Sequence, residues 1–462
     1  MNLWIRKILN KLIAPRSEQA NQTKLQIKFM PYKEAYFFTH VPKTGGTSFI
    51  VFLDRFFPAK VIFPHQLWNE IGDFKQLDKQ EYNLVRGHFG GCTADIFTDK
   101  AIRNLTILRD PVKLAYSTYE YVRRENNTAL HELVLAEDMS FETFLTHPKT
   151  KHLVTNRMVH NLVFGHGYDV SVKDMSVSDA TFAEFRKKMN RGQVKLNNED
   201  RLKIAIEFLQ QSLWFGILEQ YDDAVRLLCY KMSWPPQGVS QRLNVNKVKP
   251  VITDKAREIA LSINKMDSEL YQLALKTFKR EFAQMKASLG ASDDTEAEQL
   301  DKLIDLSYQR TYVSKYNYKL TDYVRYDCAE ILLGGQWHRR EWNALDKSYF
   351  RWSGPSQTSY LDFWVISADY LIEVKITNAI STEFIDHIKV DINGHLKQVV
   401  HKGHGKSRVL QIQCKATDVM PHGLLRINFH SQDLQPHKTH FNSDDNRVVG
   451  FALGSVEIKK NK

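Results

Sequence analysis

Residues 36–49 read YFFTHVPKTGGTSF, an aromatic and apolar run followed by a lysine, hydroxyl residues and two glycines. The run at 36–41 has the character of a buried strand, and apolar residues at helical spacing follow it. A glycine-rich turn between a strand and a helix points backbone N–H groups at an anion, and the helix dipole adds to the attraction. We therefore expect a phosphate cradle made by Lys43, Thr44, Gly45, Gly46, Thr47 and Ser48.

The order of residues in this turn differs from that of nucleotide-hydrolysing enzymes. Their P-loop reads G-x-x-x-x-G-K-[ST], with the lysine after the last glycine. Here Lys43 precedes Gly45 and Gly46, so the magnesium-site geometry of an NTPase does not map onto the turn. The strand-like run at 104–110, NLTILRD, is interrupted and is a poor Walker-B strand. These features weigh against a P-loop kinase or NTPase, which remains an alternative.

Strands and helices alternate through the first part of the chain. YNLVRGHF at 82–89 and NLTILRD are strand-like, and SLWFGILEQYDDAVRLL at 212–228 has the pattern of strand, turn and helix. Pro111 opens a helix through residue 124, because its missing N–H is unpaired in a first helical turn anyway. This alternation predicts a P-loop-like α/β fold, a parallel sheet flanked by helices.

The character of the chain changes beyond about residue 310. Short β-branched and alternating runs follow one another, and Asn393-Gly394 joins two of them with a strong hairpin signal. Strands at short spacing predict an antiparallel β-sandwich. The expected organisation is an amphipathic N-terminal extension at 1–30, an α/β domain at 31–290, a linker at 291–310 and a β-sandwich domain at 311–462.

Two segments carry a family resemblance. PKTGGT at 42–47 resembles the 5′-phosphosulfate loop of sulfotransferases that use 3′-phosphoadenosine 5′-phosphosulfate (PAPS), in the branch with heparan sulfate 2-O-sulfotransferases and their bacterial relatives. ILRDPVKLAYSTY at 107–119 is similar to the 3′-phosphate motif of that family, which implies that Arg109 and Ser117 hold this phosphate. An arginine can fork two phosphate oxygens. Without PKTGGT, the Arg109-Asp110 pair would indicate a surface ion pair at a helix start.

A third segment, VRGHFGG at 85–91, resembles the strand-end Gly-His that carries the catalytic base in this branch. The resemblance implies that His88 deprotonates the acceptor hydroxyl, a task suited to a group that titrates near neutral pH. His40 is the main rival among the seventeen histidines, and His65 and His131 are weaker candidates. Lys43 is expected to neutralise charge on the bridging oxygen as the S–O bond breaks.

The resemblance covers about residues 35–285 and implies a PAPS-dependent sulfotransferase that acts on a hydroxyl, with a carbohydrate or glycoconjugate as the expected acceptor. PAPS is the donor, and the scheme requires no metal. The basic loop at 241–250 falls where this family closes over its cofactor, so Arg242 is a candidate phosphate ligand; a solvated basic loop is the alternative. A non-catalytic protein that binds anionic glycans is the rival from another class.

The composition is consistent with several anionic partners. The net charge of +11 suits an anionic ligand, nucleic acid or an acidic membrane, and equally a generally basic enzyme. We expect no nucleic acid as partner, because no basic-aromatic motif appears. The four cysteines are far apart, which favours free thiols and leaves a disulfide open.

The N-terminus contains no continuous apolar segment of an export signal, and no apolar stretch approaches 20 residues. We therefore expect a cytoplasmic protein. Residues 1–16 could lie on a membrane surface as an amphipathic helix, but docking on the protein itself is favoured. In the C-terminal part, sugar stacking by Trp337, Trp342 or Trp352 is a hypothesis, and a place in the core is favoured for each. The sequence leaves the acceptor and the oligomeric state open.

Overall fold

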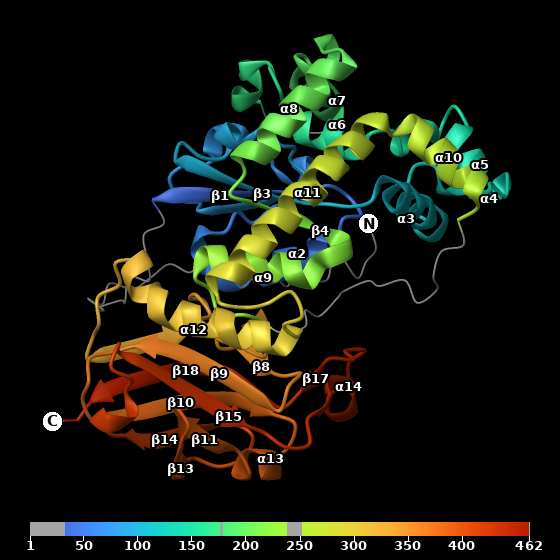
Figure 1. The fold of residues 1–462 in the computed structure, drawn as a ribbon. Helices are drawn as coiled ribbons and strands as arrows, with labels where there is room; N and C mark the ends of the chain where they lie inside the picture. The colour runs from blue at the N-terminus through green and yellow to red at the C-terminus, as the bar shows by residue number, and fades with distance from the viewer. Residues whose placement is uncertain (1–32, 176–178, 238–251, 462) are drawn as a thin grey trace.

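The protein has two lobes in a computed structural model that describes residues 33–175, 179–237 and 252–461. The predicted extension at 1–30 and the candidate Arg242 lie outside these residues. Figure 1 shows an α/β lobe above a lobe of antiparallel sheets, with helix α12 (Ala297–Lys315) lying between them. The predicted alternation of strands and helices and the change to antiparallel strands are both confirmed.

The α/β lobe is built on a parallel sheet of four strands in the order β2-β1-β3-β4. From first to last in the chain they are β1 (Glu34–Thr39), β2 (Leu84–Gly87), β3 (Ala101–Leu108) and β4 (Trp214–Ile217). The helices of this lobe are α2 (Gly46–Leu53), α3 (Pro111–Arg124), α4 (His131–Ala136), α5 (Phe141–Thr146), α6 (Arg157–Val163), α7 (Asp179–Met189), α8 (Asn198–Gln211), α9 (Tyr221–Met232), α10 (Asp254–Ile263) and α11 (Lys265–Ser288).

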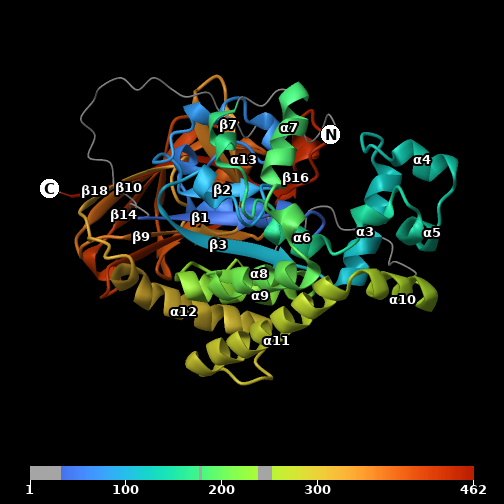
Figure 2. The same cartoon turned by 90° about the horizontal axis from the view of Figure 1, so that it is seen from above.

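The sheet is buried on both faces, as its near-continuous apolar strands predict. Tyr36 and Phe38 belong to the core shared with α2, α8, α9 and α11, whereas Phe37 between them belongs to a second core with Phe185 and Met189 of α7. Successive side chains of a strand point to opposite faces, so one short strand serves both cores. Figure 2 shows α8, α9 and α11 along one side of the sheet.

The second lobe contains two antiparallel sheets with an apolar core of their own. The larger sheet comprises β5 (Tyr323–Asp327), β7 (Trp337–Asn343), β8 (Ser348–Ser353), β10 (Tyr370–Ala379), β13 (Val399–Lys402), β14 (Arg408–Cys414) and β18 (Phe451–Lys460). The smaller sheet comprises β6 (Gly334–Gly335), β9 (Thr358–Trp364), β11 (Lys389–Ile392), β12 (His395–Lys397) and β15 (Leu424–His430). Short additional elements are α13 (Thr382–Asp386), α14 (His437–His440), β16 (Gln435–Pro436) and β17 (Val448–Val449).

The predicted hairpin at Asn393-Gly394 joins β11 to β12. Both residues have positive φ, 49° and 89°, which is the conformation that a two-residue hairpin turn demands. The side chain of Asn393 also donates to the carbonyl of Leu424 on β15, at 2.9 Å. The turn is thereby fixed to the neighbouring strand.

Helix α12 replaces most of the linker that we expected at 291–310. Leu300 and Ile304, in its first half, are buried in the core of the α/β lobe. Tyr308 and Tyr312, one and two turns later, are buried with Trp364 of the second lobe. The sequence suggested a linker because the stretch before the helix is small and acidic, whereas the apolar spacing that defines the helix begins only at Leu300.

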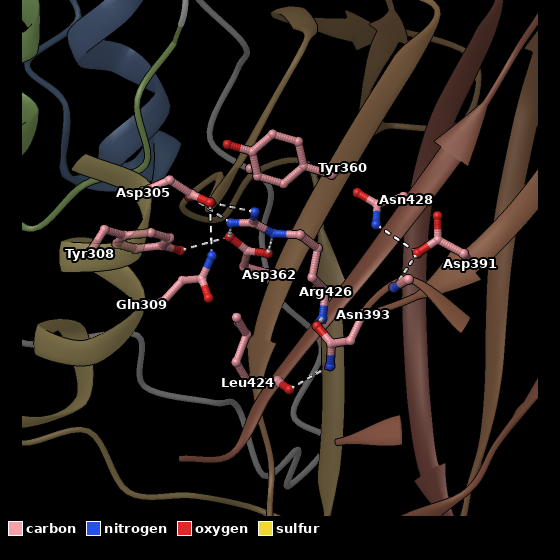
Figure 3. A network of polar contacts seen from close by, with 12 residues as sticks. Asp305, Tyr308, Gln309, Tyr360, Asp362, Asp391, Asn393, Leu424, Arg426 and Asn428 are labelled. Carbon is pink, nitrogen blue, oxygen red and sulfur yellow. Dashed lines mark hydrogen bonds and ion pairs between the residues drawn. The ribbon is translucent and has the colours of Figure 1, made fainter. Parts of the chain in front are cut away.

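Figure 3 shows how α12 is fixed to the smaller sheet. Arg426 on β15 forks the carboxylate of Asp362 on β9 at 2.7 and 2.8 Å. The same guanidinium forks Asp305 of α12, also at 2.7 and 2.8 Å, and Tyr308 donates to Asp362 at 3.1 Å. One arginine thus ties the helix to two strands.

Of the three tryptophans considered for sugar stacking, Trp337 and Trp352 are buried, with 1% and 3% of their surfaces exposed. A sugar cannot reach them, so the favoured place in the core is correct for both. Trp342 is half-buried and packs against Tyr349, with ring centroids 4.9 Å apart.

The four cysteines are unpaired thiols, as favoured from the sequence; Cys229, Cys328 and Cys414 are buried. Among the helices that the structure describes, none combines the length and apolar character needed to cross a membrane.

Candidate functional site

The three sequence motifs converge at the carboxyl ends of three adjacent strands. The cradle follows β1, His88 follows β2 and Arg109 follows β3, and β1 lies between the other two strands. In open parallel sheets ligands bind outside the carboxyl ends of the strands. The topology therefore brings the predicted residues to one edge of the sheet.

The cradle turn is shaped by left-handed backbone conformations. Lys43 has φ of 69° and Gly45, the N-cap of α2, has φ of 82°. The side chain of Thr44 turns back to the carbonyl of Val41, at 2.8 Å, and is fully buried. Thr47 is exposed at the outside of the turn and Ser48 is half-buried.

The N–H groups of this turn are available to a ligand. Among the described residues, those of Thr44, Gly45, Gly46 and Thr47 donate to no backbone carbonyl. The first N–H groups of a helix have no partner within the helix, and they carry its positive dipole end. The N–H groups of residues 44–47 can therefore donate hydrogen bonds to a phosphate or sulfate group.

Gly46 is required by the close approach of His40. A Cβ atom at Gly46 would lie 2.1 Å from Cδ2 and 2.2 Å from Nε2 of the His40 ring. His40 is 8% exposed, and burial is the main reason that its pKa lies well below the usual value. It therefore supports the turn from inside as a neutral ring.

Arg109 connects the end of β3 to the cradle. Its Nη1 atom donates to the carbonyl oxygen of Lys43 at 2.8 Å. Its Nε is buried and has no partner among the described residues. Asp110 caps helix α3 by accepting from the N–H of Lys113 at 2.9 Å, which fixes the strand-to-helix turn. The guanidinium is held beside the turn, and its Nε–H remains able to donate a hydrogen bond to a ligand.

Helix α3 presents one side to the cradle. Nζ of Lys43 lies 4.3 Å from the centre of the Tyr121 ring. Ser117 precedes Tyr121 by four residues, so the two share a helix face. No hydrogen bond joins Ser117 to Arg109 among the described contacts. Tyr121 is a site residue that the sequence reasoning missed, although its spacing from Ser117 could have indicated it.

Lys43 is half-buried, and its pKa is lowered to about 8. Burial is the largest cause, followed by the positive charges of Arg124 and Arg109, and Glu125 partly opposes them. An anion bound in the cradle would place a negative charge near Lys43 and favour its protonated form.

His88 packs directly against His40, with ring centroids 4.2 Å apart. Its Nδ1 lies 2.8 Å from the carbonyl oxygen of His40. A carbonyl only accepts hydrogen bonds, so Nδ1 carries the proton and Nε2 is left with a lone pair. Burial lowers the pKa of His88 to about 4, and the positive charge of Arg157 adds to this effect. His88 is therefore neutral at pH 7, and its burial places its pKa below the near-neutral value that we expected for the catalytic base.

Two further groups near these residues were not predicted. Glu219, after β4, accepts from the N–H of Asp110 through both oxygens at 3.3 Å, and from the Tyr271 hydroxyl at 3.0 Å. Asp267 accepts from the N–H groups of Met158 and Val159 at 3.0 and 2.9 Å, at the start of the helix that carries Arg157. No local sequence signal links residues more than 100 positions apart.

The weaker histidine candidates have other surroundings. Nδ1 of His131 lies 2.9 Å from the carbonyl of Val122, and the His65 ring packs edge-on against Phe63. None of their described contacts involves Lys43 or His88. His40 and His88 are the histidines that the fold brings to the cradle.

Comparisons with known proteins add no family. No protein-family description and no curated protein sequence matches the chain. Among solved structures, a family GH115 4-O-methyl-α-glucuronidase with specificity for decorated arabinogalactans matches at 8% identity and a TM-score of 0.20. The match covers 62% of this chain and 45% of that enzyme. A TM-score this low carries no argument about fold or function.

Proposed function

We propose that this protein is a sulfotransferase that moves a sulfuryl group from PAPS to a hydroxyl, which we assign to a carbohydrate or glycoconjugate. The observation that carries the proposal is the hydrogen bond from Arg109 Nη1 to the carbonyl of Lys43. It joins the residue assigned to the 3′-phosphate to the turn assigned to the 5′-phosphosulfate. In this proposal β1, the turn and α2 form a P-loop-like unit with the lysine placed before the glycines.

The free polar groups fit such a donor. The unpaired N–H groups of residues 44–47 offer hydrogen bonds to a 5′-phosphosulfate. The unpartnered Nε of Arg109 offers another to the 3′-phosphate, and Ser117 lies on the helix that starts beside it. Thr47 and Ser48 would add hydroxyl contacts at the first turn of α2.

The second part of the proposal concerns the proton. His88 Nε2 accepts the proton of the acceptor hydroxyl as that oxygen forms its bond to sulfur. The bond between sulfur and the phosphate oxygen breaks, and 3′-phosphoadenosine 5′-phosphate leaves with the electron pair. Lys43, charged below pH 8, stabilises the negative charge on that oxygen. Because Lys43 is part of the turn, its charge is already in place before the reaction begins.

The donor assignment is tested by calorimetric titration with 3′-phosphoadenosine 5′-phosphate, AMP and ATP with magnesium. We expect the bisphosphate to bind at least ten times more tightly than AMP, because AMP lacks the 3′-phosphate. Tighter binding of ATP with magnesium would instead support a kinase or NTPase.

The transfer itself is tested with sulfur-labelled PAPS and a panel of neutral and acidic oligosaccharides. Labelled product with wild type and none with His88→Ala, at unchanged affinity for the bisphosphate, is the expected result. Equal product from the two proteins would contradict the role of His88. Binding of the bisphosphate without transfer to any hydroxyl compound would favour a non-catalytic protein.

A further inference from the structure

Three arginines gather where the two lobes meet, away from the candidate site. Arg340 on β7 and Arg351 on β8 lie directly opposite one another, and are 8% and 1% exposed. Arg55 approaches them from η1 (Asp54–Phe56), the turn that continues α2. Like charges that face one another across a ladder destabilise it, and burial increases the cost.

The hydrogen bonds of these side chains show that the three arginines lie close together. Arg55 donates to the carbonyl of Trp337 at 2.8 Å, and Arg351 donates to the carbonyl of the next residue, His338, at 3.1 Å. Arg340 reaches across the lobes to the carbonyls of Asp54 and Phe57, beside Arg55. Arg55 and Arg351 thus bind the carbonyls of two adjacent residues, and Arg340 binds carbonyls on either side of Arg55.

None of these acceptors is a carboxylate. Arg340 also donates to the carbonyl of Ala329 at 2.8 Å, and Arg55 bonds the neutral amide of Gln237. The acid next to Arg55 in the chain, Asp54, is engaged by Arg86 at 2.8 Å. Within the described part of the chain, the three arginines therefore have no ion-pair partner.

Several donors in this space have no partner at all. Four buried guanidinium nitrogens are unpaired among the described residues: Nε of Arg55, Nε of Arg340, and Nε and Nη2 of Arg351. Tyr326 is 2% exposed, and its electrostatic neighbours include Arg351 and Arg340. Buried polar groups in proteins are almost always hydrogen-bonded, so unpaired donors of one kind in one place call for an acceptor.

The electrostatics point the same way. Burial, and then the charge of Arg351, lower the pKa of both Arg55 and Arg340 to about 10. A guanidinium that is both desolvated and repelled by its neighbours is stabilised by a bound anion. An arginine fork matches the oxygen geometry of sulfate and phosphate.

We propose that Arg55, Arg340, Arg351 and Tyr326 form a binding site for a small tetrahedral oxyanion, of the sulfate or phosphate class, between the two lobes. The site does not depend on the proposed transfer reaction. It lies at the opposite end of α2 from the cradle: Arg55 follows Gly46 by nine positions, or about 14 Å at the rise of an α-helix. A bound anion joins η1 of one lobe to β7 and β8 of the other.

Crystals of the full chain soaked in millimolar sodium selenate locate such an anion through the anomalous signal of selenium. We expect a peak among the three guanidinium groups, in wild type and also in a Lys43→Ala/Arg109→Ala variant whose cradle is impaired. A peak confined to the cradle would overturn the proposal. A peak between the lobes that needs molar selenate would be an adventitious ion only and would overturn it as well.

Thermal unfolding gives the second readout. Sodium sulfate is expected to raise the midpoint by about 3–5 °C over sodium chloride of equal ionic strength, since a ligand of the folded state stabilises it. The Lys43→Ala/Arg109→Ala background separates this rise from binding at the cradle. In Arg351→Met the rise should fall to the general effect of sulfate on folded proteins. It should persist in full in Arg325→Met, which removes an exposed arginine of β5 in the same sheet.

An equal rise in Arg351→Met and wild type would overturn the proposal, as would no rise in wild type. If Arg351→Met does not fold, the selenate peak decides alone, because it is measured on proteins with all three arginines.

Discussion

The guanidinium of Arg109 and the backbone carbonyl of Lys43 are joined by a hydrogen bond of 2.8 Å, although 66 positions separate them in the chain. Arg109 follows β3 and Lys43 lies in the turn after β1, and the parallel pairing of these two strands brings the two residues together. The hydrogen bond links the position of the arginine to the shape of the turn.

Replacing Arg109 by lysine is expected to weaken binding of 3′-phosphoadenosine 5′-phosphate by about 10–100-fold, because a lysine cannot hold the carbonyl and a phosphate at once. Affinity for AMP should change much less. Calorimetry measures both, with Arg103→Lys as control, since Arg103 lies exposed at the other end of β3 in a pair with Glu34. Equal losses for the two nucleotides would remove Arg109 from the 3′-phosphate.

The pair of His40 and Gly46 gives a second prediction. Gly46→Ala should abolish binding of the bisphosphate, because the new methyl group would overlap the buried His40 ring. Adding His40→Ala removes the obstacle and should restore a substantial part of the affinity. Calorimetry on the two single variants and the double variant measures this coupling. A double variant no better than Gly46→Ala would mean that the loss does not come from this overlap.

The pH dependence follows from two groups. His88 takes up a proton as the pH falls through about 4, and Lys43 loses its charge as the pH rises through about 8. The proposed reaction needs neutral His88 and charged Lys43, so kcat/KM for PAPS should be level between these values and fall on both sides. In Lys43→Arg the alkaline fall should disappear while the acidic one remains. An unchanged alkaline limb in that variant would exclude Lys43 as its source.

Lys43→Ala should lower kcat by about 10²–10³, the usual loss when one preorganised charge is removed from a developing anion. The rate is measured with saturating labelled PAPS. Tyr121→Phe keeps the ring beneath the lysine and serves as the control for packing. A loss confined to KM would assign Lys43 to ground-state binding alone.

The ion-pair network of α12 predicts a stability effect. Arg426→Met leaves the carboxylates of Asp305 and Asp362 without their cation, and Asp362 has 0% of its side chain exposed. The expected loss in the free energy of unfolding is about 3–5 kcal/mol, measured by urea titration. Asp305→Asn and Asp362→Asn, added to Arg426→Met, should recover part of it. Arg310→Met, an exposed arginine of the same helix, is the control and should change little.

Local sequence signals were reliable where a local physical rule decides the structure. Helix α3 runs from Pro111 to Arg124 as predicted, because proline suits its first turn and Asp110 caps it. The turn at Asn393-Gly394 follows from the demand for positive φ at both positions. The cradle, His88 and Arg109 follow successive strands of the predicted parallel sheet, and the observed strand order brings them to one edge.

What the sequence did not indicate depends on contacts between distant residues. Nothing local to His40 distinguishes a ring packed under the turn from a catalytic base; its contact with Gly46 does. The arginines between the lobes belong to segments almost 300 positions apart, and each alone has the pattern of an ordinary surface residue. The predicted linker failed for a similar reason, because the helix that replaces it is stabilised by cores on both sides.

Helix α12 has a consequence for how the protein matures. Leu300 and Ile304 complete the core of the first lobe, and Arg55 finds its carbonyl partner only at Trp337. During synthesis from the N-terminus, the core of the first lobe therefore stays incomplete, with part of its apolar surface exposed, until about two-thirds of the chain has been made. Ribosomes stalled before that point would hold an aggregation-prone intermediate, and chaperone demand should fall once α12 and β7 have emerged.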